Sequence, residues 1–195
     1  MKNTTEKITF AKLTDNDVTR ITPLIADAFE KAILEGLGEE AAAVKSQSEV
    51  FNDEALKKVS FGENVESYIV SIDDHESGIA VIKKDIAEKT NSLELFSISP
   101  KHHSRGIGAR VWNKVEELYP EATAWETTTP TFAIKNVNFY VNKCGFHIVE
   151  LLDMAKTMRD KDMTEFMGEM GEDDRYLSDP NFRYSFRFQK KLITS

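Results

Sequence analysis

Several features that decide the class of a protein are scarce in this 195-residue chain. Its one cysteine, Cys144, excludes an intramolecular disulfide and argues against a cysteine metal site. No apolar run is long enough to span a membrane, and the first ten residues contain no export segment. Basic residues are outnumbered, and the net charge of −8 argues against non-specific nucleic-acid binding. We therefore expect a cytoplasmic protein that binds neither nucleic acid nor membrane.

What the chain does contain is typical of a globular domain. Its hydrophobic fraction is 41% and its charged fraction 30%, and its length is sufficient for one buried core. The sequence shows no internal repeat and no low-complexity linker. We predict a single domain over residues 1–195, with the methionine- and acid-rich segment at about 153–180 as an insert.

The spacing of apolar residues predicts the order β-α-α-β-β-β-α-β-α-β-β, which implies an α/β (α+β) fold with a mixed sheet flanked by helices. The closing segment predicts a strand with alternate aromatic residues on one face. The predicted strands lie within 7–14, 66–73, 77–85, 91–100, 121–129, 146–154 and 182–192, and the last has Phe182, Tyr184, Phe186 and Phe188 on its aromatic face. The first predicted helix begins near Thr14 and is ended by Gly36 and Gly38. The other predicted helices lie at about 39–59, at 108–118 and at 131–143, the last with Pro130 in its first turn.

The turn before the helix at 108–118 has the features of a phosphate site. Gly106 and Gly108 allow close backbone approach, and the N–H groups at a helix N-terminus favour an anion. Arg105 and Lys101 add positive charge nearby. The alternative is a tight strand-to-helix turn with no ligand. The dinucleotide fingerprint is excluded because a third glycine is missing, and the Walker motif because no Gly-Lys-Ser/Thr follows.

Two segments resemble the conserved motifs of a known enzyme superfamily. The segment LFSISPKHHSRGIGARVWNKVEEL resembles motif A of the GNAT superfamily of acetyl-CoA-dependent N-acetyltransferases, and NVNFYVNKCGFHIVE resembles motif B. The resemblance extends over residues 8–190, apart from 153–180, and implies a GNAT-like, mostly antiparallel sheet. It also implies acetyl transfer from acetyl-CoA to a primary amine, directly, in a ternary complex.

The sequence departs from the family pattern at two positions. His103 occupies the place of the first Gln or Arg of motif A. Tyr140 lies five residues before Gly145, whereas the common spacing of four would select Val141. One helical position is a rotation of about 100°. Either the helix end is bulged, or Tyr140 does not point where the tyrosine of the family points.

The resemblance assigns binding roles to two stretches and one further residue. A splayed strand end with a free N–H would polarise the thioester carbonyl. Backbone N–H groups of the glycine turn would hold the pyrophosphate. Asn136 would bond the pantetheine arm or, alternatively, help to cap its helix. The predicted binding residues are Phe96, Ser97, Ile98, His103, Ser104, Arg105, Gly106, Ile107, Gly108, Ala109 and Asn136.

Catalysis requires a base for the amine and an acid for the leaving thiolate. We select Glu94 as the base, because residues 94, 96 and 98 of a strand share a face. The resemblance supports this choice, since an acid in this family often lies four residues before the Val or Ile position of motif A, which is Ile98 here. Glu126 or a water chain is the alternative, as is a merely solvated glutamate at position 94. We select Tyr140 as the acid, against a packed aromatic with its hydroxyl at the surface.

No metal site is expected. His102 and His103 are adjacent on a loop and diverge, and the acidic segment around Asp160 lacks the glycine and the terminal glutamate of a calcium loop. Cys144 is interpreted as a small hydrophobic residue at a helix end. The methionines of the insert, Met163, Met167 and Met170, either belong to a solvated segment or pack over the acceptor site or a dimer contact.

The resulting hypothesis is an N-acetyltransferase that uses acetyl-CoA and no metal. Its acceptor would be a small amine or a peptide, and the net acidity favours a cationic one. The alternative is a non-catalytic acyl-CoA-binding or protein-interaction module with the same fold. The sequence leaves the acceptor and the oligomeric state open, a homodimer included.

Overall fold

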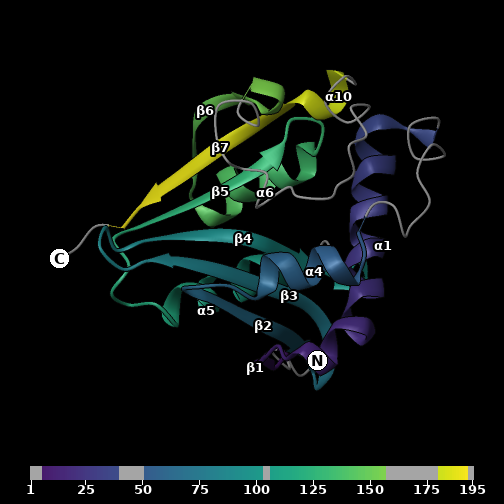
Figure 1. Ribbon diagram of the computed structural model, residues 1–195, viewed down its shortest axis with the longest axis vertical. Helices are drawn as coiled ribbons and strands as arrows, with labels where there is room; N and C mark the ends of the chain where they lie inside the picture. Colours follow the sequence, from purple (N-terminus) through teal and green to yellow (C-terminus); the bar gives the residue numbers. More distant parts are fainter. Residues whose placement is uncertain (1–5, 40–50, 103–105, 157–179, 193–195) are drawn as a thin grey trace, which may run out of the picture.

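The structure is a computed structural model that describes residues 6–39, 51–102, 106–156 and 180–192 (Figure 1). Within these ranges the chain forms one seven-stranded sheet with helices on both faces. The strands are β1 (Ile8–Lys12), β2 (Val65–Ile72), β3 (His75–Asp85), β4 (Thr90–Ile98), β5 (Ala124–Pro130), β6 (His147–Asp153) and β7 (Tyr184–Lys191). The helices are α1 (Val18–Leu37), α4 (Asp53–Ser60), α5 (Ile107–Glu117), α6 (Ile134–Cys144) and α10 (Pro180–Arg183), with 3-10 turns η1 (Asp15–Asp17) and η2 (Pro100–His102).

The sheet has the order β1-β2-β3-β4-β5-β7-β6. All neighbouring strands are antiparallel except β4 and β5, which are parallel. The α5 helix provides the crossover that this parallel pair requires. The prediction of a mixed, mostly antiparallel sheet flanked by helices is therefore confirmed.

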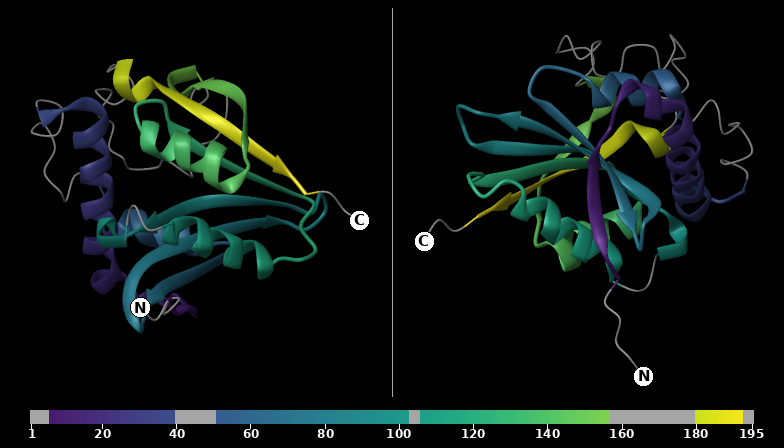
Figure 2. Two further views of the ribbon diagram at one scale, coloured as in Figure 1. Left: turned by 180° about the vertical axis from the view of Figure 1, so that it is seen from behind. Right: turned by 90° about the horizontal axis from the view of Figure 1, so that it is seen from below.

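Two hydrophobic clusters lie on opposite faces of the sheet. Helices α5 and α6 cover one face, where Trp112 and Trp125 pack edge to face with ring centroids 5.0 Å apart. Helices α1 and α4 cover the other, where Ile25 and Leu56 are fully buried. Figure 2 shows α5 and α6 side by side, seen from behind. Burial of these apolar side chains is the main source of stability for the fold.

The parallel strands β4 and β5 pair over only part of their length. The last paired residues are Leu93 and Thr127, although β4 continues to Ile98 and β5 to Pro130. Beyond this point the strands diverge, and Figure 1 shows the resulting V with α1 standing across its open side. The V divides the sheet into a β1–β4 half and a β5–β7–β6 half.

The C-terminal turn of α1 contacts the loop between β5 and α6. A Cβ on Gly36 would lie 2.6 Å from the carbonyl oxygen of Phe132, closer than real Cβ atoms approach backbone. Glu35 and Lys135 form an ion pair of 2.8 Å beside this contact. Only glycine therefore fits at this position, and the contact joins α1 to the second half of the sheet.

Most predicted elements are present, with three corrections. Gly36 lies inside α1 and does not end it, since the helix continues to Leu37 with Gly38 as the C-cap residue. A glycine stands at position 36 because the close approach to Phe132 requires a residue without a side chain. Pro130 is the last residue of β5 and not part of the next helix. Phe182 lies in α10, where its ring packs against Phe132 with centroids 5.1 Å apart, so it does not share the strand face of Phe186 and Phe188.

Two predicted segments lie largely outside the described residues. The helix predicted at about 39–59 is described only as α4, since residues 40–50 are outside. The insert predicted at about 153–180 falls mostly within 157–179, so Met163, Met167, Met170 and Asp160 are also outside.

Candidate active site

The divergence of β4 from β5 leaves the Phe96 backbone N–H of β4 directed into the opening. The Ser99 N–H donates to the Ser77 carbonyl oxygen at 2.7 Å, and Ser97 pairs in register with Ile79 on β3. Because bonding direction alternates along an antiparallel ladder, the Phe96 N–H points away from β3, toward the part of β5 that no longer pairs. Of the predicted stretch 96–98, Phe96 thus has the geometry of a donor at the opening, and Ser97 is directed to β3.

Ile98, the third predicted residue of this stretch, is buried at the end of β4. It pairs in register with Gly78, where a Cβ would lie 2.1 Å from the Ser97 carbonyl oxygen. Glycine at position 78 therefore permits the close pairing of β3 with the end of β4.

Glu94 is the extra residue of a β-bulge. Ile82 pairs with Leu93 and Val81 with Leu95, so Glu94 has no counterpart on β3. Leu93 packs in the cluster under α5 and α6, whereas Leu95 packs in the cluster under α1 and α4. Residues 93 and 95 therefore face opposite sides, and the strict alternation expected from the sequence is interrupted at the proposed base.

The interruption removes the geometric reason for placing residues 94, 96 and 98 on one face. The bulge nevertheless places the half-buried Glu94 one residue beyond the last β4–β5 pair, at the start of the opening. Its carboxylate has no ion pair or hydrogen bond with any side chain in the described ranges. Its role as a base remains a prediction.

Glu126, the alternative base, is held in an ion pair. Its Oε1 accepts from Arg187 at 3.1 Å and from Gln189 at 2.9 Å. It lies opposite Ser92 in the paired part of β4 and β5, before the opening begins. Its charge is therefore compensated at a distance from the diverging strand ends.

The N-terminus of α5 carries backbone donors that have no acceptor within the helix. Gly106 is the N-cap residue, with a φ of +71° that favours glycine. The first backbone bond of the helix runs from Arg110 N–H to the Gly106 carbonyl oxygen at 3.2 Å. The N–H groups of Ile107, Gly108 and Ala109 therefore have no acceptor within the helix and can bind an anion.

Gly108 also has a packing role that the sequence analysis did not predict. A Cβ at this position would lie 3.1 Å from the ring of Phe139 on α6. The Phe139 ring in turn stacks on Phe96, with centroids 5.8 Å apart and planes at 11°. These contacts join the start of α5 to the strand end beside the opening.

Three of the predicted pyrophosphate ligands, His103, Ser104 and Arg105, lie outside the described residues. Lys101 is exposed beside them. His102 lies within hydrogen-bonding distance of Ser77, with Nε2 and Oγ separated by 3.1 Å.

The Tyr140 side chain is buried, with 7% of its surface exposed. Its ring is packed in the cluster under α5 and α6. The Gly145 N–H and the Phe146 N–H both donate to the Tyr140 carbonyl oxygen, five and six residues back. An α-helix bonds to the residue four back, so the final turn of α6 is widened. A bulged helix end, the first of the two alternatives for the register of Tyr140, is therefore present.

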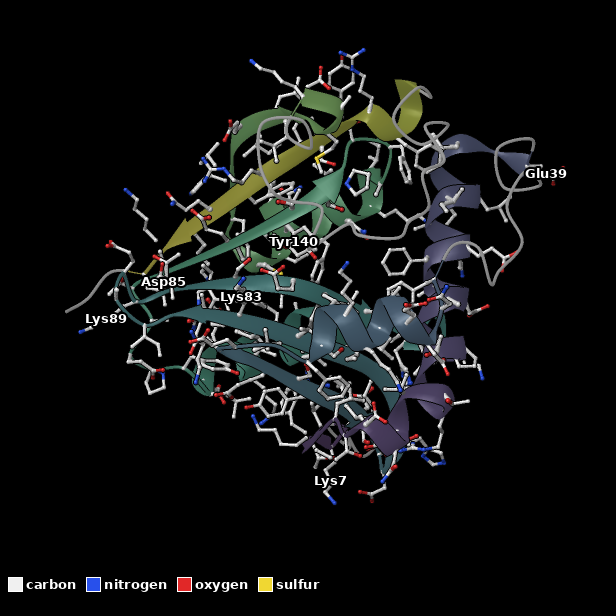
Figure 3. The ribbon with its side chains drawn as sticks, in the orientation of Figure 1. Lys7, Glu39, Lys83, Asp85, Lys89 and Tyr140 are labelled. Atoms are coloured by element: carbon white, nitrogen blue, oxygen red, sulfur yellow. The ribbon has the colours of Figure 1, made fainter. Side chains whose placement is uncertain are left out.

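The nearby Thr127 hydroxyl lowers the pKa of Tyr140, but burial acts in the opposite direction and is the larger effect. Burial raises the pKa of Tyr140 to about 12, so the phenol keeps its proton at neutral pH. The Thr127 hydroxyl also donates to the Leu93 carbonyl oxygen at 2.9 Å. In the view of Figure 3, Tyr140 lies between β4 and β5, and Lys89 lies at the far tip of the β3–β4 hairpin.

Thr127 is a site residue that the sequence analysis missed. Its only sequence signal was a run of three threonines, Thr127–Thr129, in a strand that is otherwise expected to be apolar on its buried face. The side chain of Thr127 is almost fully buried. A buried hydroxyl requires a partner, and here its partner is the Leu93 carbonyl oxygen.

Asn136 is exposed in the first turn of α6. The N-cap residue of this helix is Ala133, and no side chain caps it, so the capping alternative for Asn136 is not what the structure has.

Cys144 is buried, and burial raises the pKa of its thiol to about 12, in agreement with an unreactive cysteine.

Over the described ranges, no cluster of three or more His, Cys, Asp or Glu side chains is arranged to hold a metal ion. In the same ranges, no helix is both long and apolar enough to cross a membrane.

Comparison with known proteins identifies a family and a relative that together cover most of the chain. The profile of the Acetyltransferase (GNAT) family matches residues 30–146. An uncharacterized protein of Bacillus subtilis, YrkN, is 36% identical over 180 residues, which cover 90% of this chain and 89% of YrkN.

Two solved structures share the fold at low sequence identity. A Bacillus subtilis acetyltransferase in complex with CoA is 19% identical, with a TM-score of 0.56 over 96% of this chain and 99% of that chain. The PaiA N-acetyltransferase of Thermoplasma acidophilum, in complex with coenzyme A, is 13% identical, with a TM-score of 0.61 over 95% of this chain and 99% of that chain.

Proposed function

The chain belongs to the acetyltransferase (GNAT) family, and we propose that it transfers an acetyl group from acetyl-CoA to a primary amine. Membership of the family gives acyl transfer as the general class of reaction. The identity of the donor and the amine acceptor are our proposal.

The observation that carries the proposal is the opening between β4 and β5. It begins after the Leu93–Thr127 pair, and it is adjoined by an N–H donor from Phe96 and by the buried Tyr140 hydroxyl. An extended ligand can bind between two half-sheets that are separated in this way. The polar groups then lie beside it, at the end where the strands begin to diverge. Backbone donors aimed into such a site stabilise negative charge that develops during a reaction.

The residues at the start of α5 fit the diphosphate of acetyl-CoA. The N–H groups of Ile107, Gly108 and Ala109 lack helical acceptors, and the helix dipole adds partial positive charge there. Among the described residues, no atom lies within 4 Å of a Cβ position on the exposed Gly106, which favours space for a ligand on that side. When bound, acetyl-CoA supplies an activated acetyl group and a thiol leaving group.

In the proposed reaction, the Glu94 carboxylate takes a proton from the amine, directly or through water, and the amine nitrogen bonds to the carbonyl carbon. The Phe96 N–H donates to the carbonyl oxygen as that oxygen gains negative charge. The bond from carbon to sulfur then breaks, and Tyr140 donates its proton to the sulfur. The raised pKa of Tyr140 keeps this proton available at neutral pH.

The proposed acceptor is a small cationic amine or a peptide amine. The chain carries a net charge of −8, and Glu94 has no cationic partner in the described ranges, which favours a positively charged ligand. An assembly into dimers and a location in the cytoplasm are compatible with this proposal and remain expectations.

Isothermal titration with acetyl-CoA tests the proposal, with desulpho-CoA and ATP as control ligands. We expect micromolar binding of acetyl-CoA and its loss in Gly106→Trp. Gly38→Trp is a matched control, because Gly38 also has a positive φ, +85°, and open space around its Cβ position. Circular dichroism checks that both variants fold.

The outcomes separate the two functions considered. Binding followed by turnover with an amine supports the transferase. Binding without turnover over a panel of cationic amines supports an acyl-CoA-binding module. The absence of binding to any CoA species would contradict both.

A further inference from the structure

We propose that an open cavity beside the Glu94 bulge binds a carboxylate of the acceptor, and that Lys83 supplies the positive charge for it. The acceptor is then a small molecule that carries an amine and, several carbon atoms away, a carboxylate. The inference rests on the proposed function, because it assumes that the amine to be acetylated lies at Glu94.

The cavity has a volume of about 620 Å³. Its lining comes from the ends of β3 and β4 that meet at their hairpin, from the turn between them, from Asn64 before β2, and from Glu126 on β5. Of the described residues, none from α1 or α4 lines it. The cavity thus lies over a part of the sheet that these two helices leave uncovered.

Three lining residues form one row across the sheet. Lys83 on β3 pairs in register with Ser92 on β4, and Ser92 pairs with Glu126 on β5. One strand neighbour of each belongs to the cluster under α5 and α6, namely Ile82, Leu93 and Trp125. Because successive side chains of a strand point to opposite faces, the row points to the face on which α1 and α4 pack.

Within this row, Lys83 is a cation without a partner. It is exposed, and it forms no ion pair or hydrogen bond with any residue in the described ranges. The half-buried Ser92 hydroxyl likewise has no partner there. Glu126, in contrast, is compensated by Arg187 and Gln189. An ammonium and a hydroxyl side by side favour an anion, and a carboxylate can accept a hydrogen bond from each.

The other charged groups of the lining already have partners. Lys84 forms an ion pair with Glu66. Asp85 accepts from the N–H groups of Ala87 and Glu88 in the hairpin turn, at 3.0 Å each. The Asp85 carboxylate keeps its negative charge, so the second amine of a diamine is the competing ligand for this cavity.

The distance from Glu94 to Lys83 determines the length of the acceptor. Glu94 lies two residues beyond Ser92 on β4, and Lys83 lies opposite Ser92 on β3. Two residues along a strand and one step between strands separate the two backbones by about 8 Å. In the view of Figure 3, Lys83 lies between Tyr140 and the hairpin tip at Lys89. A chain of five methylenes between amine and carboxylate has about this reach, as in 6-aminohexanoate or in lysine acetylated at its side chain.

The first test measures binding without turnover. 6-Aminohexanoate is titrated into the protein with CoA bound, and 6-aminohexanamide, which has the same length but no charge at the far end, is the matched ligand. We expect the carboxylate to bind about tenfold more tightly, the effect of one charge-assisted hydrogen bond. Equal affinities would overturn the proposal. Tighter binding of 1,5-diaminopentane than of 6-aminohexanoate would assign the cavity to a second amine and would also overturn it.

Variants of Lys83 test the residue itself. Lys83→Met should bind the two matched ligands equally, because methionine keeps the length of the side chain and loses its charge. Lys83→Arg keeps the charge and should retain most of the preference. Lys89→Met is the control, since Lys89 is exposed on the same hairpin and lies outside the lining. A preference that persists in a folded Lys83→Met would contradict the assignment.

Thiol release from acetyl-CoA with the same amines separates this inference from the proposed function. We expect Lys83→Met to raise the KM for 6-aminohexanoate about tenfold and to leave kcat within about twofold, because Lys83 lies away from the reacting atoms. If no thiol is released although 6-aminohexanoate binds through Lys83, the transferase function fails for these amines and the carboxylate site stands. If 1,5-diaminopentane is acetylated and 6-aminohexanoate is not, the function stands and this inference fails.

Discussion

The backbone N–H of Gly145 donates to the carbonyl oxygen of Tyr140, five residues earlier in α6. This widened turn absorbs the one residue by which the chain departs from the usual motif spacing, so Tyr140, and not Val141, is the buried residue at this point. The left-handed conformation of Gly145, with a φ of +79°, makes the turn possible.

Replacement of Tyr140 by Phe should lower kcat by roughly 10²-fold, the lower end of what a general acid contributes. Binding of acetyl-CoA should be unchanged. Because burial raises the pKa of Tyr140 to about 12, the phenol stays protonated between pH 6 and pH 10. The rate of the unmodified protein should therefore not fall at alkaline pH through loss of this proton. Thiol release as a function of pH measures both effects.

The matched control for this change is Tyr119→Phe, which also removes a buried hydroxyl. Tyr119 donates to Glu66 at 3.1 Å and lies outside the proposed site. If both variants lose activity to the same extent, Tyr140 has no specific role.

Replacement of Glu94 by Gln should reduce kcat/KM about 10²-fold, since an amide cannot accept the amine proton. Glu126→Gln should reduce it less, because Glu126 is already bonded to Arg187 and Gln189. The two variants are compared by initial rates at saturating acetyl-CoA. A larger loss for Glu126→Gln would reverse the assignment of the base.

Replacement of Gly36 by Ala should destabilise the fold by about 1–3 kcal/mol, the usual cost of overpacking. The added methyl would lie 2.6 Å from the Phe132 carbonyl oxygen, so α1 must move away from the β5–α6 loop. Urea denaturation measures the change in the free energy of unfolding.

Gly62→Ala provides the control, because the nearest atom to its Cβ position, Cγ2 of Val65, is at an ordinary 3.5 Å. Equal stability of the two variants would show that α1 does not depend on this close contact.

The stability of the fold should decrease at low pH because of Glu66. Burial by itself would raise the pKa of Glu66, but four hydrogen bonds together outweigh it and hold the pKa well below its ordinary value of 4.5. The donors are Lys84, Tyr68, Lys12 and Tyr119. A carboxylate with a lowered pKa in the folded state contributes stability that is present above pH 4.5 and is lost as the pH falls below it.

In Glu66→Gln, thermal stability should therefore fall less steeply below pH 4.5 than in the unmodified protein. The midpoint of thermal unfolding, recorded from pH 7 to pH 3, measures this difference. Glu63→Gln, at an exposed position of the preceding turn, is the control and should leave the profile unchanged. An unaltered slope in Glu66→Gln would contradict the assignment.

The amino-acid sequence alone determined the element order, the glycine turn and the family. These features are local: the period of apolar residues distinguishes helix from strand, and the two motifs combine backbone requirements with spacing. Gly106 illustrates this, because its φ of +71° at the start of α5 is the reason that a glycine stands there.

The arrangement of the candidate site was decided by tertiary structure. The bulge at Glu94 depends on how β4 pairs with β3, and the opening depends on where β4 and β5 cease to pair. Neither leaves a periodic signal in one strand, because register is a relation between strands. The bond from Thr127 to Leu93 joins residues 34 positions apart, and the contact of Gly36 with Phe132 joins two distant segments. Such contacts form only when the whole chain is packed, because a hydrogen bond or a close approach needs both partners in place at once.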